Sequence, residues 1–158
     1  GNTDAQLLLA KCYDFGRGVP EDTRQAAYWY QRAAEAGNAN AQDNLGTCYL
    51  TGAGVTQNLT TAFLWYQKAA AQGNSSALNN MGLCYKNGEG TVQNPTLAAD
   101  CFQRAATIGN ADAQYNLGKC YAMGIGREEN EEMAKQWISK AAAQGHQNAA
   151  AFMSDKGW

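Results

Sequence analysis

Small and apolar residues return along the chain with the three- and four-residue spacing of one helical face. Residues 39–51 carry them at Ala41, Leu45 and Cys48, and the segment that begins near residue 59 carries them at Ala62 and Tyr66. This spacing predicts two amphipathic helices. A Gly-x-Gly sequence separates the two segments and predicts the turn of a helical hairpin.

The hairpin pattern repeats every 36 residues, with no insertion or deletion. The complete units are residues 1–36, 37–72, 73–108 and 109–144, and a partial unit, 145–158, is expected to close the array as a capping helix. Two helices of this length cannot bury their apolar faces alone, so neighbouring units must stack. We therefore predict an all-α chain, with residues 1–158 forming a single solenoid of four helix-turn-helix repeats.

Polar residues mark the predicted helix starts. A side-chain oxygen directly before a helix can accept a hydrogen bond from a free backbone N–H, which makes asparagine and aspartate favourable N-caps. These residues stand before the first helices at Asn38, Asn74 and Asn110, and before the second helices at Asp22, Asn58, Asn94 and Asn130. His146, the single histidine, takes the same place in the last unit, so we expect it to cap a helix rather than transfer protons.

Composition and charge argue against two classes of binding partner, nucleic acids and anionic membranes. The formal net charge is −2, the pI is about 5.3, and lysine and arginine are spread along the chain without clustering. The chain therefore has no basic surface typical of nucleic-acid or anionic-membrane binding. No apolar run approaches the roughly 18–20 residues of a membrane span, so we expect no membrane insertion. The chain begins at Gly1 without a methionine, and its compartment cannot be read from this end.

The consensus of the units carries a family resemblance. A-x-x-x-L-G-x-x-Y-x-x-G-x-G-V followed by A-x-x-W-Y-x-K-A-A-x-x-G, seen most fully in residues 41–73, resembles the Sel-one-like repeat, a relative of the tetratricopeptide repeat. The resemblance implies a right-handed α/α superhelix whose concave groove is lined mainly by the first helices. It also implies an adaptor that binds a partner protein or peptide. The third unit departs from the motif, with Cys101-Phe102 in place of Trp-Tyr.

The resemblance places one asparagine of each later unit in the groove, at Asn44, Asn80 and Asn116. The matching asparagine of many tetratricopeptide domains binds a peptide backbone, and an amide suits this because it both donates and accepts. Other groove-facing candidates are Lys11, Asp14, Asp43, Thr47, Asn79, Leu83, Lys86, Tyr115, Lys119 and Met123. Since no two lysines align around the asparagines, a ligand with a terminal carboxylate is not specially indicated. The alternative is that these are ordinary solvated helix positions.

Four of the five cysteines share one position of the repeat, at Cys12, Cys48, Cys84 and Cys120. Equivalent points of stacked helices lie about 10 Å apart, too far for a shared metal ion or a disulfide. We predict small packing residues, no metal site and no cofactor. A bridge between Cys84 and Cys101 stays open. The lack of regular cysteine pairs slightly favours a reducing compartment.

Catalysis is not expected. Some Sel-one-like proteins are linked to β-lactam binding, but the chain has no S-x-x-K sequence, and its Gly-x-Gly turns lack the G-K-[ST] ending of a phosphate loop. A hydrolase is therefore a remote alternative to the binding scaffold. A nearer alternative is a structural spacer or oligomerisation module, with end-to-end self-association through Leu7, Leu8 and Leu9.

Overall fold

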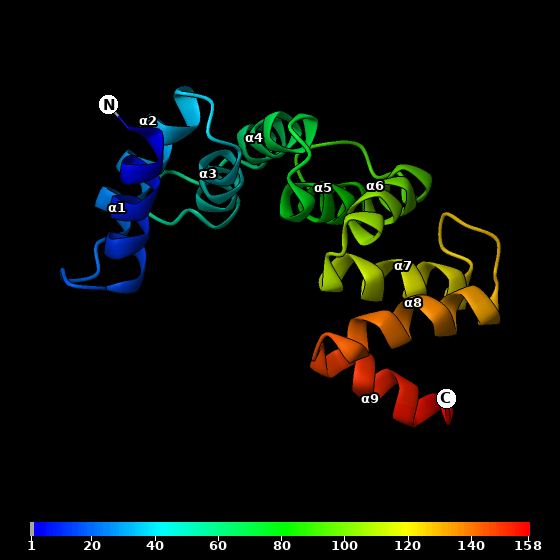
Figure 1. Cartoon of the computed structure of the whole chain (residues 1–158). Coiled ribbons are helices and arrows are strands. Elements are labelled where there is room, and N and C mark those ends of the chain that lie inside the picture. The colour runs from blue at the N-terminus through cyan, green and yellow to red at the C-terminus, as the bar shows by residue number, and fades with distance from the viewer. Residues whose placement is uncertain (1) are drawn as a thin grey trace. The chain divides into compact units, whose positions relative to one another are not determined.

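The computed structural model describes residues 2–158, and helices are the regular secondary structure of this part of the chain (Figure 1). The repeats contribute pairs of helices, and a last helix follows them: α1 (Thr3–Phe15), α2 (Thr23–Glu35), α3 (Ala39–Thr51), α4 (Leu59–Ala71), α5 (Ser75–Asn87), α6 (Pro95–Ile108), α7 (Ala111–Met123), α8 (Glu131–Ala143) and α9 (Gln147–Lys156). The predicted all-α class, the four hairpins and the closing helix are confirmed. None of these helices has the length and apolar character that a membrane crossing requires.

The chain divides into two compact units, an N-terminal one that ends at Ala77 and a C-terminal one, Leu78–Trp158. In the N-terminal unit α1 packs on α2, α2 on α3, and α3 on α4. In the C-terminal unit α6 packs on α7, α7 on α8, and α8 on α9. Within each unit these helices therefore contact their neighbours in sequence, as expected for successive hairpins that stack.

The predicted N-caps are confirmed. The Asp22 carboxylate accepts hydrogen bonds from the backbone N–H groups of Arg24 and Gln25, both at 3.0 Å. Asn58 and Asn74, which also stand in glycosylation-type Asn-x-Ser/Thr sequences, accept from Thr61 and Ala77 at 2.9 and 2.8 Å. The other predicted asparagines cap their helices in the same way: Asn38, Asn94, Asn110 and Asn130. Asn2, which was not predicted, caps α1.

The caps of the first helices have a second role that the sequence did not reveal. The Asn38 amide also donates to the Asp4 carboxylate at 3.2 Å, and the Asn74 amide donates to Asn40 at 2.8 Å. His146 does the same with a ring: Nδ1 accepts from Ala149 N–H at 3.1 Å, and Nε2 lies 3.2 Å from an oxygen of Asp112. These caps therefore tie the start of one repeat to the start of the preceding repeat.

Two buried glutamines form a further contact between repeats. Gln42 donates to the carbonyl oxygen of Ala34 at 3.1 Å and accepts a hydrogen bond of 2.8 Å from Gln72, the last residue of its own repeat. Gln114 and Gln144 form the same pair in the C-terminal unit, also at 2.8 Å. These contacts cannot be predicted from the sequence, because a glutamine on an apolar helix face carries no distinctive pattern.

The first repeat has only half of this pair, and it supplies a testable prediction. Gln6 occupies the place of Gln42, but Ala36 stands where Gln72 would be, and Gln6 Oε1 is buried without a hydrogen-bond partner. Because Ala36 and Gln72 have similar backbone angles, φ −79° and −90°, glutamine fits at residue 36. We expect Ala36→Gln to raise the free energy of unfolding by about 0.5–1.5 kcal/mol. Urea titration of the wild-type chain and the variant measures this difference in the free energy of unfolding.

The control for that experiment is Ala36→Glu, which has the same length but places an acceptor where a donor is needed. We expect no gain from the glutamate. An equal gain from both substitutions would show that the chain length of the new side chain, and not the hydrogen bond to Gln6, raises the stability.

Candidate functional site

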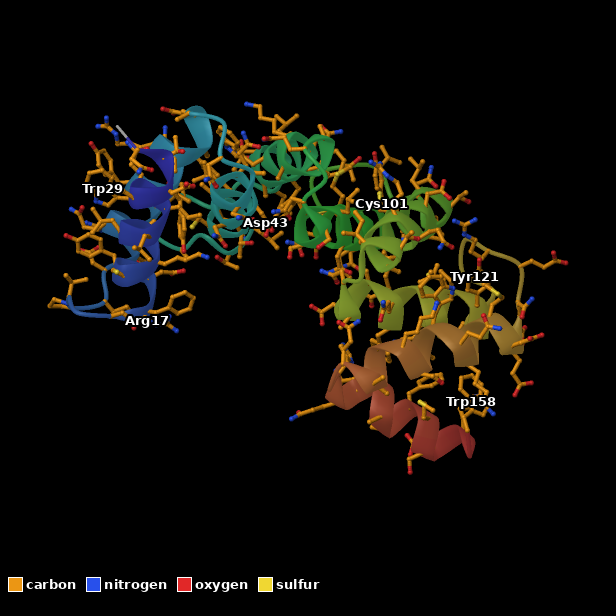
Figure 2. All side chains as sticks on the ribbon, in the orientation of Figure 1. Arg17, Trp29, Asp43, Cys101, Tyr121 and Trp158 are labelled. Atoms are coloured by element: carbon orange, nitrogen blue, oxygen red, sulfur yellow. The ribbon has the colours of Figure 1, made fainter. Side chains whose placement is uncertain are left out.

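In the N-terminal unit, the predicted groove residues lie on α1 and α3. Lys11 is half-buried on α1, and Asp43, labelled in Figure 2, lies on α3 beside Asn44. The Thr47 hydroxyl lies 3.1 Å from the Tyr66 hydroxyl and 3.3 Å from the Asp43 carbonyl oxygen. Asn44 is half-buried and forms no hydrogen bond to the described residues, so its amide can both donate to and accept from a bound segment.

In the C-terminal unit, the structure corrects the expectation for Asn79. Its side chain is only 6% exposed, and its Oδ1 accepts a hydrogen bond of 2.9 Å from the Asn116 amide. Asn79 therefore joins α5 to α7 instead of facing solvent. A buried amide must find a partner inside the protein, and Asn116 provides it, which leaves Asn116 Oδ1 as the free acceptor of that side chain.

Tyr115 also lies differently from the expectation. Its ring stacks on the His146 imidazole, with the ring centroids 4.7 Å apart, and meets the Phe152 ring edge-on at 6.3 Å. Lys119 Nζ lies 5.5 Å from the same ring. Tyr115 therefore holds α9 against α7, and it is not available as a free groove side chain. Leu83 and Asn80 are half-buried on α5.

The C-terminal unit contains a pocket of about 140 Å³ that brings several predicted groove residues together. Asn116, Lys119 and Met123 of α7 line it, with Lys86 from the end of α5. The rest of the lining is apolar, from Ala98, Phe102, Cys120 and Ile125. The sequence register aligns no two lysines around the asparagines, yet two lysines line the pocket that Asn116 also lines. Lys86 and Lys119 are far apart in sequence, and the stacking of repeats brings them to the same pocket as Asn116.

The departure of the third repeat from the motif explains why this pocket is apolar. Tyr30 and Tyr66 occupy the position of Phe102 in the first two repeats, and their hydroxyls bond Asp14 at 2.9 Å and Thr47 at 3.1 Å. Phe102 has no hydroxyl, and Lys86 replaces the aspartate at the matching position. The third repeat therefore lacks the buried tyrosine hydrogen bond and presents a ring and an ammonium group instead.

Positive charge dominates the electrostatics of the pocket. Burial raises the pKa of the Cys120 thiol on its floor, while Lys86, Arg127 and Lys119 act in the opposite direction. Arg127 is paired with Asp100 at 2.8 Å, and no acidic residue lines the pocket. An anionic group at the mouth would therefore be attracted and would meet no carboxylate.

The remaining cysteines fit the packing role predicted for them. All five are unpaired, including Cys84 and Cys101, so the bridge that the sequence left open is not formed. Burial raises the pKa of the Cys48 and Cys84 thiols to about 11, with a smaller contribution from a nearby carboxylate. Such thiols stay protonated at neutral pH and are poor nucleophiles. Among residues 2–158 no three histidine, cysteine or acidic side chains gather to hold a metal ion.

Comparison with known proteins identifies the repeat. The family described as Sel1 repeat matches residues 3–38, 39–74, 75–110 and 111–146. No curated protein matches the chain. A solved structure of a Sel1 repeat protein from Oxalobacter formigenes is 37% identical, with a TM-score of 0.88, and the match covers 98% of this chain and 61% of that protein.

Two further structures have different biological descriptions. A protective antigen of uropathogenic Escherichia coli with an SLR fold is 36% identical, with a TM-score of 0.90 over 99% of this chain and 34% of the antigen. An immunity protein from Pseudomonas aeruginosa is 27% identical, with a TM-score of 0.68 over 93% of this chain and 55% of that protein. The chain thus spans less than two thirds of each of these three proteins.

Proposed function

The chain belongs to the Sel1 repeat family, and from this membership we propose that it is a protein-interaction scaffold that holds a segment of a partner protein against the first helices of its repeats. The observation that supports the proposal is the set of polar side chains on these helices. Asn44 has an unused amide in the N-terminal unit, and Asn116 and Lys119 line a pocket in the C-terminal unit. Core packing does not account for these side chains.

The physical basis is backbone recognition with local selectivity. An amide such as Asn44 can bond a peptide group of any sequence, because it offers one donor and one acceptor side by side. In the N-terminal unit Lys11 adds positive charge, and in the C-terminal unit Lys119 adds it beside an apolar pocket with room for one side chain. Within each unit these groups suit an extended segment better than a metal ion or a nucleotide.

The experiment compares two variants of the whole chain as bait in a lysate of the organism that encodes it. One variant removes the proposed contacts, Lys11→Ala, Asn44→Ala and Lys119→Ala. The control, Lys135→Ala, Lys156→Ala and Gln67→Ala, removes the same two charges and one amide from exposed positions elsewhere. We expect the first variant to recover the partner about tenfold less in quantitative mass spectrometry, since each lost polar contact contributes about 0.5–1.5 kcal/mol.

The variant avoids Asn116 for a structural reason. Replacing Asn116 would leave the buried Asn79 without its hydrogen-bond partner and would disturb the fold as well as the surface. Equal recovery of partners by the two variants would contradict the proposed function.

A second candidate function is end-to-end association, and the surface of α1 favours it. Leu8 is 65% exposed and Phe15 is 59% exposed, and large apolar side chains of this kind often mark an interface. A sedimentation mass that rises with concentration, and that Leu8→Ser and Phe15→Ser return to the monomer value, would support this spacer or oligomerisation role.

A further inference from the structure

We propose that a cleft lined by α1 and α2 of the N-terminal unit binds a primary carboxamide, the group carried by a glutamine or asparagine side chain or by a small amide. Gln6 Oε1 accepts a hydrogen bond from the NH₂ group of the ligand, and Arg32 donates one to its carbonyl oxygen. The residues that line this cleft differ from those assigned to the scaffold. The inference therefore goes beyond the proposed function and is independent of it.

The other repeats show what the first repeat lacks. At the position of Gln6 the second and fourth repeats also carry glutamine, and each of these glutamines accepts a hydrogen bond of 2.8 Å from a second glutamine at the end of its own repeat. The third repeat replaces both partners with apolar residues, Leu78 and Ile108. Only the first repeat combines a glutamine with a residue too short to reach it, Ala36.

The place of the missing side chain is open. A cleft of about 590 Å³ lies there. Its lining comprises Gln6, Tyr28, Gln31, Arg32, Glu35 and Ala36. Gln6 Oε1 is buried, and no group among residues 2–158 donates a hydrogen bond to it. Since buried oxygens normally have a hydrogen-bond partner, the cleft presents an unused acceptor where two other repeats place a glutamine NH₂ group.

Two charged side chains of α2 favour an amide over an acid or an amine. Arg32 lies over the Tyr28 and Trp29 rings, with its guanidinium carbon 5.9 Å from each ring centroid (Trp29 is labelled in Figure 2), and its Nη1 donates to the Tyr28 hydroxyl at 3.0 Å. A guanidinium group has five N–H donors, so Arg32 can also donate to a ligand. Glu35 adds a carboxylate to the lining.

A primary amide fits these groups because it donates and accepts without carrying a charge. A carboxylate ligand brings no donor to the buried oxygen and is repelled by Glu35. An ammonium ligand brings no acceptor and is repelled by Arg32. The cleft therefore matches the same functional group that the paired glutamines supply in the second and fourth repeats.

The test uses N-acetyl-L-glutamine methylamide, which presents a glutamine side chain within a capped backbone. It is titrated into the ¹⁵N-labelled whole chain and followed by NMR. For a ligand of this size we expect a Kd of about 1–10 mM, with the largest shifts at the Gln6 side-chain amide and the backbone amides of Glu35 and Ala36. The matching glutamate and methionine derivatives lack the NH₂ group and should bind about tenfold more weakly.

Propionamide distinguishes the source of the amide. If the glutamine derivative binds at least tenfold more tightly than propionamide, the ligand is a side chain of a polypeptide whose backbone adds contacts. If the two bind equally, the ligand is a small amide. Both results support carboxamide recognition by this cleft.

Two substitutions remove the site in different ways. Ala36→Gln supplies an amide from the protein itself and should weaken binding of the glutamine derivative at least tenfold. Ala71→Gln adds the same side chain at an exposed position of α4 and should leave binding unchanged. Gln6→Met removes the acceptor but keeps the chain length, so we again expect about tenfold weaker binding. Its control is Gln67→Met, the same change at an exposed position.

Three outcomes would overturn the inference: no shift of the Gln6 and Ala36 resonances, equal binding of the glutamine and methionine derivatives, or normal binding by a variant of either residue. If one of these variants loses the native ¹⁵N spectrum, the other one decides. The scaffold proposal is tested separately, because its variant changes Lys11, Asn44 and Lys119, which do not line the cleft. Failure of amide binding leaves the scaffold proposal intact, and normal partner recovery by the scaffold variant leaves the amide site intact.

Discussion

Gly54→Ala is expected to lower the free energy of unfolding by about 3–4 kcal/mol, whereas Gly18→Ala, at the same position of the first repeat, should lower it by about 1–2 kcal/mol. Both glycines have left-handed backbone angles, with φ of +72° and +77°. An L-residue in that conformation costs about 1–2 kcal/mol. The two substitutions therefore share this backbone cost.

The difference between them comes from the preceding repeat. A β-carbon on Gly54 would overlap the backbone carbonyl of Thr23, the first residue of α2, whereas nothing lies within 4 Å of a β-carbon on Gly18. The overlap adds an overpacking cost of about 1–3 kcal/mol, because the helix start must move away. Gly126 meets the Pro95 carbonyl in the same way in the C-terminal unit. These glycines thus permit the repeats to approach, in addition to forming the turn.

Urea titration followed by circular dichroism measures the effect on the wild-type chain and the two variants. A loss for Gly54→Ala that equals the loss for Gly18→Ala would contradict the contact with Thr23. Comparable losses at both positions would assign the glycines to the turn alone.

Ile138→Ala is expected to lower the free energy of unfolding by about 3–4 kcal/mol, and Gly118→Ala by about 1–2 kcal/mol. Ile138 is fully buried, so its truncation leaves a cavity. A β-carbon on Gly118 would overlap Ile138 Cγ1 and would lie 3.2 Å from the Ala134 carbonyl oxygen. Gly118 lies within α7, where alanine is otherwise the better helix former, and this preference reduces the net cost.

The double substitution Gly118→Ala with Ile138→Ala is expected to cost about 1–2 kcal/mol less than the two single losses together. The new methyl group then occupies part of the cavity that the isoleucine leaves, so the two changes compensate. Leu45→Ala belongs to the core of the N-terminal unit, and its combination with Gly118→Ala should be additive. Additive losses for Gly118 and Ile138 would refute the direct contact between α7 and α8.

The helices could be predicted from the sequence because their signals are local. The period of 36 residues, the Asn and Asp caps and the glycine turns act within a few residues of each helix end, and each of them is confirmed. Gly46 permits the close approach of α3 and α4, because the Tyr66 ring lies against it, with Cε1 2.7 Å from the place of a β-carbon. Each of these signals recurs at the same position of successive repeats, so the interpretation of one repeat applies to the others.

The candidate site could be predicted only in part. The common position of Asn44 and Asn116 followed from the repeat, but the sequence did not show that Asn116 is tied to Asn79 while Asn44 has no such partner. Asn116 bonds Asn79 of the repeat before it. The residue that matches Asn79 in the repeat before Asn44 is Leu7, whose apolar side chain cannot accept a hydrogen bond. Equivalent positions therefore differ in chemistry according to the residue that the neighbouring repeat brings to them.

The amino-acid sequence by itself thus determined the elements of this protein: the helix boundaries, the caps, the turns and the small residues at which helices meet. Only the tertiary structure decided which side chains share an environment. In the folded chain Asn79 is buried, the Tyr115 ring packs against His146, and Lys86 lines the same pocket as Asn116 and Lys119. The physical reason is the distance along the chain over which each kind of interaction acts. Backbone conformation depends on residues a few positions apart, whereas hydrogen bonds and pockets depend on side chains that stacking brings together from successive repeats.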